Sequence, residues 1–359
     1  MTTAHVAVPD SLEVALSPQW LTAALRQRFP GVEVRAVIPG PVVDRISTNA
    51  RFVIECAGET PEGLSPALCV KGYFNDIGRT ARQVGAPEAF FYRDIATRTN
   101  VRTLRSVYAD IDPVTHHGVV ITEDVVPQGA TFLDGNSSYT ASQTAQSLTE
   151  LARLHAATWA DPRYVRERWL TPRLGAALEV WGAAKAKEII AGNHHGPNGL
   201  RMPDEIRDAE RLLEAYRLLI SRATAETTTQ PWCVIHGDAH VGNLFLAADD
   251  RSSLLDWQLI QRGMWYLDVG YHIASTLTVD ERRSAEHDLL RHYLDALATF
   301  GVSPPSLDEA CRAIASGMLH GLFLWSITTK QPPEVISTLL HRLGTAVADH
   351  EAMPTSRRR

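Results

Sequence analysis

The sequence predicts an α+β protein of two lobes, a β-rich first lobe and a larger, mainly helical second one. Short β-rich runs separated by turn residues fill the first third of the chain. From about residue 139 the spacing of apolar residues changes from two to nearly four, which is typical of amphipathic helices. Residues 232–256 interrupt the helical part with short β-like runs. We therefore expect a first lobe at residues 1–122, a hinge at 123–130 and a second lobe at 131–359.

The first lobe is expected to open with a helix over Ser17–Phe29, because Ser17 can cap it and Pro18 suits its first turn. A loop is expected over residues 40–49, and a second helix over Ala86–Thr99. The β-rich runs that predict strands are Val32–Pro39, Arg51–Cys56, Ala67–Phe74, Ser106–Ile111 and Gly118–Thr122.

The second lobe is expected to be a set of helices around one polar loop. In Thr140–Trp159, Leu148, Leu151 and Leu154 share one helix face with His155, which we interpret as a core histidine. The other predicted helices are 172–192, 203–223, 281–299, 306–327 and 333–350, and the short strands are Cys233–Ile235, Leu244–Leu246 and Leu254–Leu255.

Composition argues against several classes of function. The chain has 359 residues, is 45% hydrophobic and carries a formal charge of -6, with no basic run before Arg357–Arg359, so a nucleic-acid partner is not expected. The four cysteines lie far apart without a CxxC pair, which predicts reduced, buried thiols. No signal peptide and no apolar run near the ~20 residues of a membrane span are seen. We expect a cytoplasmic protein without a membrane partner.

The polar loop at residues 236–243 carries the most informative residues, His-Gly-Asp-Ala-His-Val-Gly-Asn. Asp238 and Asn243 stand five residues apart, and Asp256 follows thirteen residues after Asn243. An Asn and an Asp completed by ATP oxygens would suit Mg²⁺, which prefers oxygen ligands. Phosphoryl transfer needs positioning, charge neutralisation by a metal, and a carboxylate for the acceptor proton. These three side chains can fill those roles.

A buried strand of the first lobe is predicted to carry a lysine, Lys71. A lysine in an apolar strand costs free energy unless it is paired. Glu88 in the next helix can pair with it and so fix a positive charge; Glu55 and Glu59 are less well placed.

This set of motifs resembles the aminoglycoside/choline/ecdysteroid-kinase-like phosphotransferase superfamily, the small-molecule relatives of protein kinases. The resemblance rests on the 236–243 pattern, on Asp256-Trp257-Gln258 and on Asp268, and it is strongest within residues 232–275. It implies a bilobal protein-kinase-like fold with a small antiparallel-sheet N-lobe. It also implies a kinase that uses ATP and Mg²⁺ to phosphorylate a hydroxyl of a small molecule.

The resemblance assigns a role to each candidate residue. The chain has no GxGxxG before Lys71, so the loop that would cover the phosphates is Asp44–Asn49, and Asp256 is followed by Trp-Gln where protein kinases have Phe-Gly. The implied roles are Asp238 as catalytic base, Asn243 and Asp256 as Mg²⁺ ligands, Lys71 and Glu88 at the phosphates with Ser47, Thr48 and Asn49, the backbone of Glu123, Asp124 and Val125 at adenine, and His236, His240 and Asp268 as support.

Simpler interpretations compete with some of these roles. His236 and His240 could belong to a His/Asp metallohydrolase site, or could stiffen the loop by hydrogen bonds. Asp268 could be a helix N-cap. The paired histidines at 116–117 and 194–195 are expected in turns or on the surface, and helical tryptophans are expected in the core. A catalytically silent pseudokinase that acts as an interaction module is the main alternative function.

The acceptor is expected to be a neutral or moderately apolar alcohol. In the family it is bound by second-lobe helices, here within 160–228 and 305–350. The first of these segments mixes acidic and basic residues almost evenly, and Gly317–Trp325 is largely apolar. A site for a polycation should instead gather carboxylates.

Overall fold

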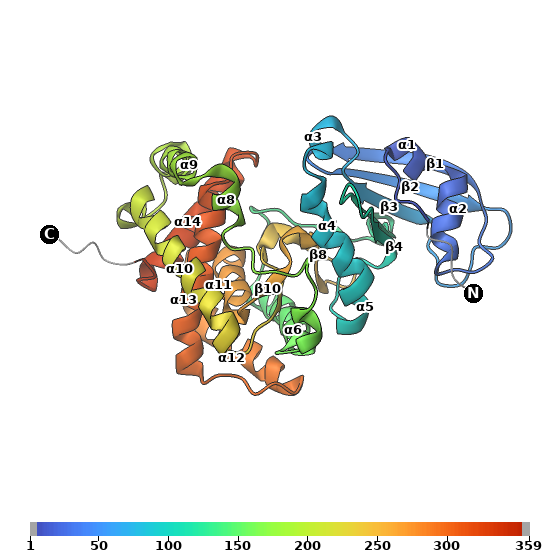
Figure 1. Ribbon diagram of the computed structural model, residues 1–359. Helices are drawn as coiled ribbons and strands as arrows, with labels where there is room; N and C mark the ends of the chain where they lie inside the picture. Colours follow the sequence, from blue (N-terminus) through green and yellow to red (C-terminus); the bar gives the residue numbers. More distant parts are fainter. Residues whose placement is uncertain (1–5, 354–359) are drawn as a thin grey trace. The chain divides into compact units, whose positions relative to one another are not determined.

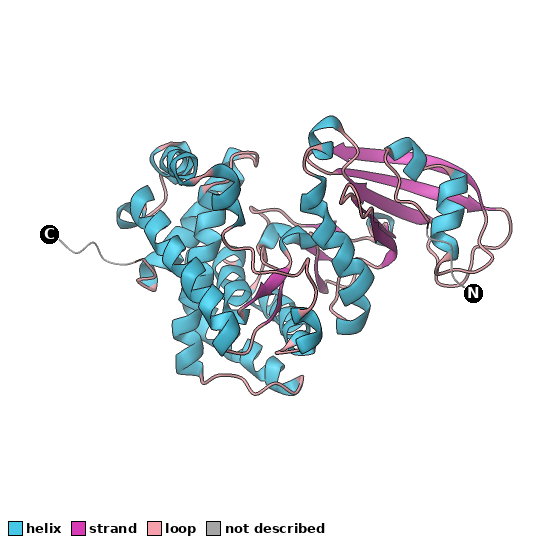
Figure 2. Cartoon of the chain, viewed as in Figure 1, coloured by secondary structure: helices cyan, strands magenta, loops and turns pink. Residues whose placement is uncertain are grey.

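Strands gather in the first part of the chain and helices in the second (Figure 2). The computed structural model describes residues 6–353. It divides into unit 1, Met1–Thr131 with Leu255–Gln258, and unit 2, Phe132–Leu254 with Leu259–Arg359. No helix within the described range is long and apolar enough to cross a membrane.

Unit 1 is an antiparallel sheet with helices packed on it (Figure 1). Its strands run in the order β1-β2-β3-β5-β4. The elements are α1 Leu12–Ala15, α2 Pro18–Arg26, β1 Val34–Asp44, β2 Thr48–Cys56, β3 Ala67–Gly72, α3 Asp76–Arg79, α4 Arg82–Phe90, the π-helical turn η1 Phe91–Ile95, α5 Ala96–Thr99, β4 Ser106–Ile111, β5 Gly118–Glu123 and η2 Val126–Gln128. The next strand, β6 Thr131–Phe132, begins on the last residue of this part of unit 1 and ends on the first residue of unit 2.

The core of unit 1 lies between α2 and one face of the sheet. Leu21 and Leu25 of α2 are buried in one cluster with strand residues such as Phe52 and Val70. Ser17 caps α2 through its side chain, as expected, but the helix ends at Arg26 rather than at Phe29. Because successive strand residues point to opposite faces, Lys71 points away from α2.

The predicted loop at residues 40–49 is wrong in extent. β1 continues to Asp44 and β2 begins at Thr48, so the turn is only three residues long. Gly40 and Pro41 are turn-forming residues, but here they lie where the β1–β2 register shifts between Pro39 and Val42. Such a bulge bends an edge strand without ending it.

Unit 2 contains the remaining elements. α6 packs on α12, and α11 on α13, which also contacts α14. The elements are α6 Ala141–Thr158, α7 Pro162–Val165, α8 Ala176–Trp181, α9 Ala183–His195, η3 Pro197–Gly199, η4 Asp204–Ile206, α10 Ala209–Thr229, β7 Cys233–Ile235, η5 Val241–Asn243, β8 Leu244–Leu246, β9 Ser252–Leu254, η6 Trp257–Leu259 (whose first residues belong to unit 1), β10 Gln261–Gly263, α11 Trp265–Thr276, α12 Val279–Thr299, α13 Leu307–Ser326 and α14 Pro333–Asp349.

Glycines allow α11 and α13 to approach closely (Figure 1). A Cβ atom on Gly317 of α13 would overlap the carbonyl oxygens of Tyr266 and Leu267 of α11. A Cβ atom on Gly321, one turn further along α13, would overlap the ring of Tyr271. The two helices therefore pack almost backbone to backbone, and side chains of both helices contact the loop at residues 236–243.

Several expectations about single residues are corrected. His117 and His194 are buried rather than on the surface: His117 accepts the backbone N–H of Tyr73 at 2.8 Å, and His194 lies 2.7 Å from the Ser326 hydroxyl. The helical Trp181 is exposed. The cysteines are free, but only Cys233 among them is buried.

Candidate active site

The polar loop predicted to be catalytic begins directly after the buried strand β7. Gly237 adopts a positive φ of 80°, and a Cβ atom there would overlap the carbonyl oxygen of Leu259, so the loop requires glycine at this position. His240 caps the short helix η5 by accepting the N–H of Gly242 at 3.0 Å. His236 accepts the N–H of Asp238 at 3.3 Å. Both histidines thus stiffen the loop.

Asp268 holds the start of this loop from the first turn of α11. Its carboxylate accepts the N–H of His236 at 2.7 Å and that of Gly237 at 2.8 Å, and His155 lies 3.1 Å away. Asp268 is fully buried, which would raise its pKa, but His155 and the loop groups more than offset this and lower the pKa. The buried carboxylate is therefore charged. The N-cap of α11 is Met264, not Asp268.

Two buried histidines hold the carbonyl groups of the same loop. His272 Nδ1 lies 2.7 Å from the Ala239 carbonyl oxygen, and His320 Nε2 lies 3.0 Å from that of Gly237. A carbonyl can only accept, so each histidine donates through the named nitrogen. Burial lowers the pKa of His272 to about 4 and also lowers that of His320. Both rings are therefore neutral donors at neutral pH.

The carboxylate of Asp238 is fixed at both oxygens. Tyr271 donates to Oδ1 at 3.1 Å, and Asn243 Nδ2 donates to Oδ2 at 3.1 Å. Asn243 Nδ2 also donates to the Asp238 carbonyl oxygen at 2.8 Å, so its amide oxygen is the atom left to face a cation. His240 Nε2 lies 3.8 Å from Oδ2.

Asp238 lies at a cavity of about 240 Å³ in unit 2. The lining is aromatic, aliphatic or neutral polar apart from Asp238 and the imidazole of His240. Its residues are Asp238, His240, Leu259, Tyr271, Leu324, Trp325, Ile327, Thr328 and Gln331. The predicted acceptor segment 305–350 thus contributes to this cavity, whereas the segment 160–228 contributes none of these residues.

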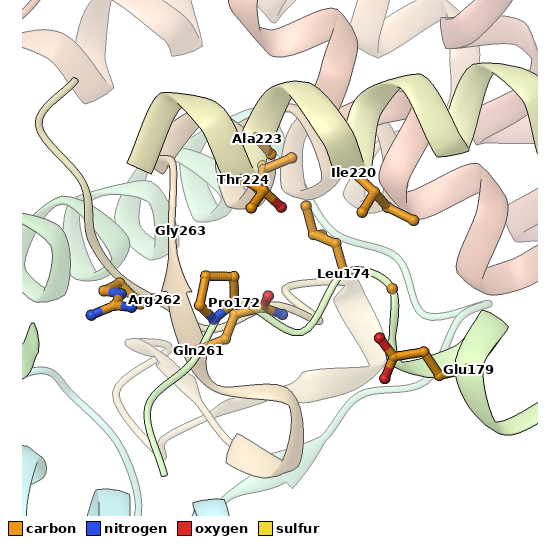
Figure 3. Close-up of a pocket in the computed structure, with 11 residues that line it drawn as sticks. Pro172, Leu174, Glu179, Ile220, Ala223, Thr224, Gln261, Arg262 and Gly263 are labelled. Carbon is orange, nitrogen blue, oxygen red and sulfur yellow. The ribbon is translucent and has the colours of Figure 1, made fainter. Parts of the chain in front are cut away.

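Residues from 160–228 line another, smaller cavity of about 110 Å³ (Figure 3). Figure 3 shows Pro172 and Leu174 facing Ile220 and Thr224 of α10. None of the predicted site residues lines it. Its lining is a mixture of aliphatic and separate polar groups, without a polar cluster of the kind found at Asp238.

In unit 1 the predicted lysine is held by two carboxylates. Lys71 Nζ lies 2.6 Å from Glu88 Oε2 and 3.0 Å from Asp256 Oδ1. Burial alone would lower the pKa of Lys71, but Asp256 and Glu88 more than offset this and raise it. Burial raises the pKa of Glu88 against the opposing effect of Lys71. The structure thus brings together three residues that are far apart in the sequence.

Asp256 has an unusual backbone, with a positive φ of 62°. Non-glycine residues rarely adopt this conformation, and when they do it is often at a functional site. The next residue anchors the segment: Trp257 stacks on Phe91 with ring centroids 3.7 Å apart and donates to Thr103 at 3.0 Å. The segment Leu255–Gln258 is in this way part of unit 1.

The β1–β2 turn is braced by a polar cluster of Asp44 and Thr48, which lie in the predicted loop, and Asn75, which the sequence did not reveal. Thr48 donates to Asp44 at 2.6 Å, and Asn75 donates to Asp44 at 2.5 Å and to the Arg45 carbonyl oxygen at 2.9 Å. Ser47 is buried, and Asn49 stands opposite Lys71 in the β2–β3 ladder. Opposite residues of antiparallel strands share a face, so Asn49 and Lys71 lie on the same side of the sheet.

The predicted hinge begins at Glu123, the last residue of β5. The N–H of Glu123 donates to the Arg105 carbonyl oxygen at 2.9 Å, and that of Asp124 donates to Ala67 at 3.0 Å. The side chain of Asp124 pairs with Arg51 at 2.7 Å. Val125 comes next and directly precedes the short helix η2.

Residues 6–353 do not contain the set of metal ligands that a metallohydrolase site would need. No group of three or more His, Cys, Asp or Glu side chains that could hold a metal ion occurs within that range. His236 and His240 instead accept backbone N–H groups, as described above.

The chain matches the family model of the phosphotransferase enzyme family over residues 129–302. Among solved structures, a choline kinase from Cryptosporidium parvum Iowa II is 11% identical, with a TM-score of 0.58 over 93% of this chain and 96% of the kinase. The GDP complex of a variant of aminoglycoside 2′-phosphotransferase-IIIa is 14% identical, with a TM-score of 0.50 over 93% and 99% of the two chains. No curated protein sequence matches the chain. The matches confirm the predicted fold class, the superfamily resemblance and the expected enzyme class, a small-molecule kinase.

Proposed function

Because the chain matches the phosphotransferase enzyme family over residues 129–302 and shares the fold of small-molecule kinases, we propose that it transfers the γ-phosphate of ATP to a hydroxyl group of a small molecule, with Mg²⁺. The observation that carries the proposal is the fixed carboxylate of Asp238 at a cavity. The acceptor oxygen bonds to the γ-phosphorus, and its proton passes to Asp238. The bond from the γ-phosphorus to the β–γ bridging oxygen breaks, and ADP leaves.

Asn243 and Asp256 fit a magnesium site by their chemistry, since both offer oxygen atoms. Leu244 pairs with Leu254 in the β8–β9 hairpin, so Asn243 just precedes and Leu255 just follows that pair. Asp256 is one residue further along the chain. When bound, Mg²⁺ would neutralise charge on the phosphate oxygens.

For the nucleotide we propose unit 1. Lys71, oriented by Glu88, would meet the phosphates, and Ser47, Thr48 and Asn49 would lie along them. Since the N–H groups of Glu123 and Asp124 already donate within the protein, Val125 is favoured as the residue whose N–H meets adenine. In this proposal residues 1–122 form the nucleotide lobe, 123–130 the hinge and 131–359 the acceptor lobe, and the free cysteines support a reducing, cytoplasmic location.

For the acceptor we propose a neutral or moderately apolar alcohol. Asp238 is the one carboxylate among the residues that line the cavity, and it is needed for the acceptor proton. A polycation would be left without further counter-charges there. Leu324, Ile327 and Trp325 offer an apolar wall instead.

The test is a panel of neutral alcohols and sugars, with aminoglycosides as the charged comparison, incubated with ATP and Mg²⁺ and analysed by mass spectrometry for an added phosphate. Asp238→Asn should lower kcat by about 10²–10⁴-fold with little change in ATP affinity, because a general base acts mainly in the transition state. Transfer by Asp238→Asn at the wild-type rate would refute the assignment. ATP binding without transfer to any acceptor would favour the pseudokinase, and better turnover of aminoglycosides would refute the neutral acceptor.

A further inference from the structure

Two aromatic side chains form a hydrogen-bonded chain that ends on Asp238. Trp325 of α13 donates from Nε1 to the Tyr271 hydroxyl at 2.7 Å. The Tyr271 hydroxyl lies 3.1 Å from Asp238 Oδ1. All three residues line the cavity of about 240 Å³.

The direction of this chain follows from its end groups. An indole N–H can only donate, and an ionised carboxylate can only accept. The Tyr271 oxygen therefore accepts from Trp325, and its single proton must point to Asp238. A hydroxyl that accepts one hydrogen bond becomes a better donor in the next. Burial and the nearby Asp238 raise the pKa of Tyr271 well above its usual value, so the proton stays on the phenol.

Packing holds both aromatic residues rigidly. Tyr271 is fully buried, and Trp325 is 5% exposed. The absence of a side chain at Gly321 makes room for the Tyr271 ring, and the rings of Trp325 and His240 form a T-shaped contact at 87° with centroids 5.1 Å apart. The hydroxyl of Tyr271 therefore reaches Asp238 from a fixed position in the α11–α13 pair.

We propose that Tyr271 and Trp325 are positioning residues that set the orientation of the Asp238 carboxylate, an inference that rests on the proposed function. The terminal torsion of an Asp side chain is broad, so a carboxylate held by one partner can turn. Asn243 holds one oxygen and Tyr271 the other, which fixes the plane of the group. The lone pair that receives the acceptor proton then points in one direction.

The first test is Tyr271→Phe, which removes only the hydroxyl. Hydrogen bonds to charged groups contribute about 1.5–3 kcal/mol, so kcat should fall about 10–100-fold, while KM for ATP and for the acceptor changes by less than about threefold. Tyr139→Phe is the matched control, because it also removes a buried hydroxyl. That hydroxyl bonds to Ser252 at 2.6 Å and not to Asp238, so kcat should stay at the wild-type value.

The second test is a double-mutant cycle of Trp325→Phe with Tyr271→Phe. If Trp325 acts on Asp238 through Tyr271, Trp325→Phe should lower kcat in the wild-type background and have little further effect on kcat in Tyr271→Phe. Trp325→His keeps a ring N–H and should restore part of kcat. Thermal melts check whether each variant is folded. If Trp325→Phe does not fold, the comparison of kcat between Tyr271→Phe and Tyr139→Phe decides the question.

The outcomes separate this inference from the proposed function. Wild-type protein that transfers no phosphate to any acceptor contradicts the proposed function itself. If the wild-type protein is active, any of three results overturns the positioning role. These are an unchanged kcat in Tyr271→Phe, an effect of Tyr271→Phe on KM alone, and additive effects of Tyr271→Phe and Trp325→Phe on kcat. A fall in kcat with near-constant KM and strong non-additivity supports it.

Discussion

At the scale of single residues, the candidate site balances each buried charge locally. Lys71 is paired with two carboxylates, and Asp268 with backbone N–H groups and His155. A buried charge that loses its partner costs much more than the pair contributed. Substitutions of one partner should therefore affect stability as well as activity.

Lys71→Met should show this effect. The variant leaves Glu88 buried without a cation, so we expect a loss of about 3–5 kcal/mol in the free energy of unfolding. Urea denaturation measures it. The double variant Lys71→Met with Glu88→Gln, which also removes the charge of the more deeply buried of the two carboxylates, should regain part of the loss. A single variant as stable as the wild type would show that Glu88 reaches another partner or water.

The histidines beneath the loop predict a loss of stability in acid. Burial lowers the pKa of His272 from 6.5 to about 4, so the unfolded chain binds this proton more tightly than the folded one. Its stabilising contribution is present above pH 6.5 and is lost as the pH falls toward 4, by about 2 kcal/mol at pH 5. Denaturant midpoints at pH 7.5 and 5 should therefore differ less for His272→Asn than for the wild type. Equal pH dependence of the two proteins would contradict the prediction.

At the scale of elements, the sequence predicted those segments whose two faces differ. α6 begins and ends within one residue of its predicted bounds, because one face is apolar and Thr140 caps it. α11 was not predicted from its pattern because all of its residues are buried, so no polar face gives it a helical period. The β1–β2 turn was misplaced because Gly40 and Pro41 form a bulge in an edge strand instead of a loop.

The contact of α11 with α13 depends on glycine. In Gly317→Ala the new methyl group would overlap α11 backbone carbonyls, and backbone cannot move as a flexible side chain does. We expect a loss of about 1–3 kcal/mol from overpacking, and a lower kcat because Tyr271 and His320 shift. Gly192→Ala in α9 is the matched control, since nothing lies within 4 Å of its new Cβ atom. Helix propensity should make that variant more stable by up to about 1 kcal/mol, and thermal melts compare the two.

At the scale of the whole molecule, the motifs and their resemblance predicted the fold class, but the supporting residues came from tertiary contacts. Lys71 and Glu88 could be proposed because a buried lysine requires an acidic partner, and Asp256 because it follows the polar loop as a possible Mg²⁺ ligand. The ion pair of Asp256 with Lys71 was not predicted. Tyr271, His272, His320 and Trp325 could not, because single polar atoms in apolar helices are common and their partners are set by the packing of α11 and α13. Asn75 was missed for a similar reason, since its role depends on the short β1–β2 turn.

The chain leaves unit 1 at residue 131 and returns to it for four residues, Leu255–Gln258. Trp257 completes the unit by stacking on Phe91, so Trp257→Ala should leave a cavity and cost about 3–5 kcal/mol. Hydrogen exchange should lose protection in α4 and η1, next to Phe91, more than in α12 of unit 2. Trp257→Phe keeps one aromatic ring at Phe91 but loses part of the buried indole and the hydrogen bond to Thr103, so it should cost less than Trp257→Ala. Uniform loss of protection in both units would instead mean that they unfold as one, and the returning segment would then couple the folding of unit 1 to that of unit 2.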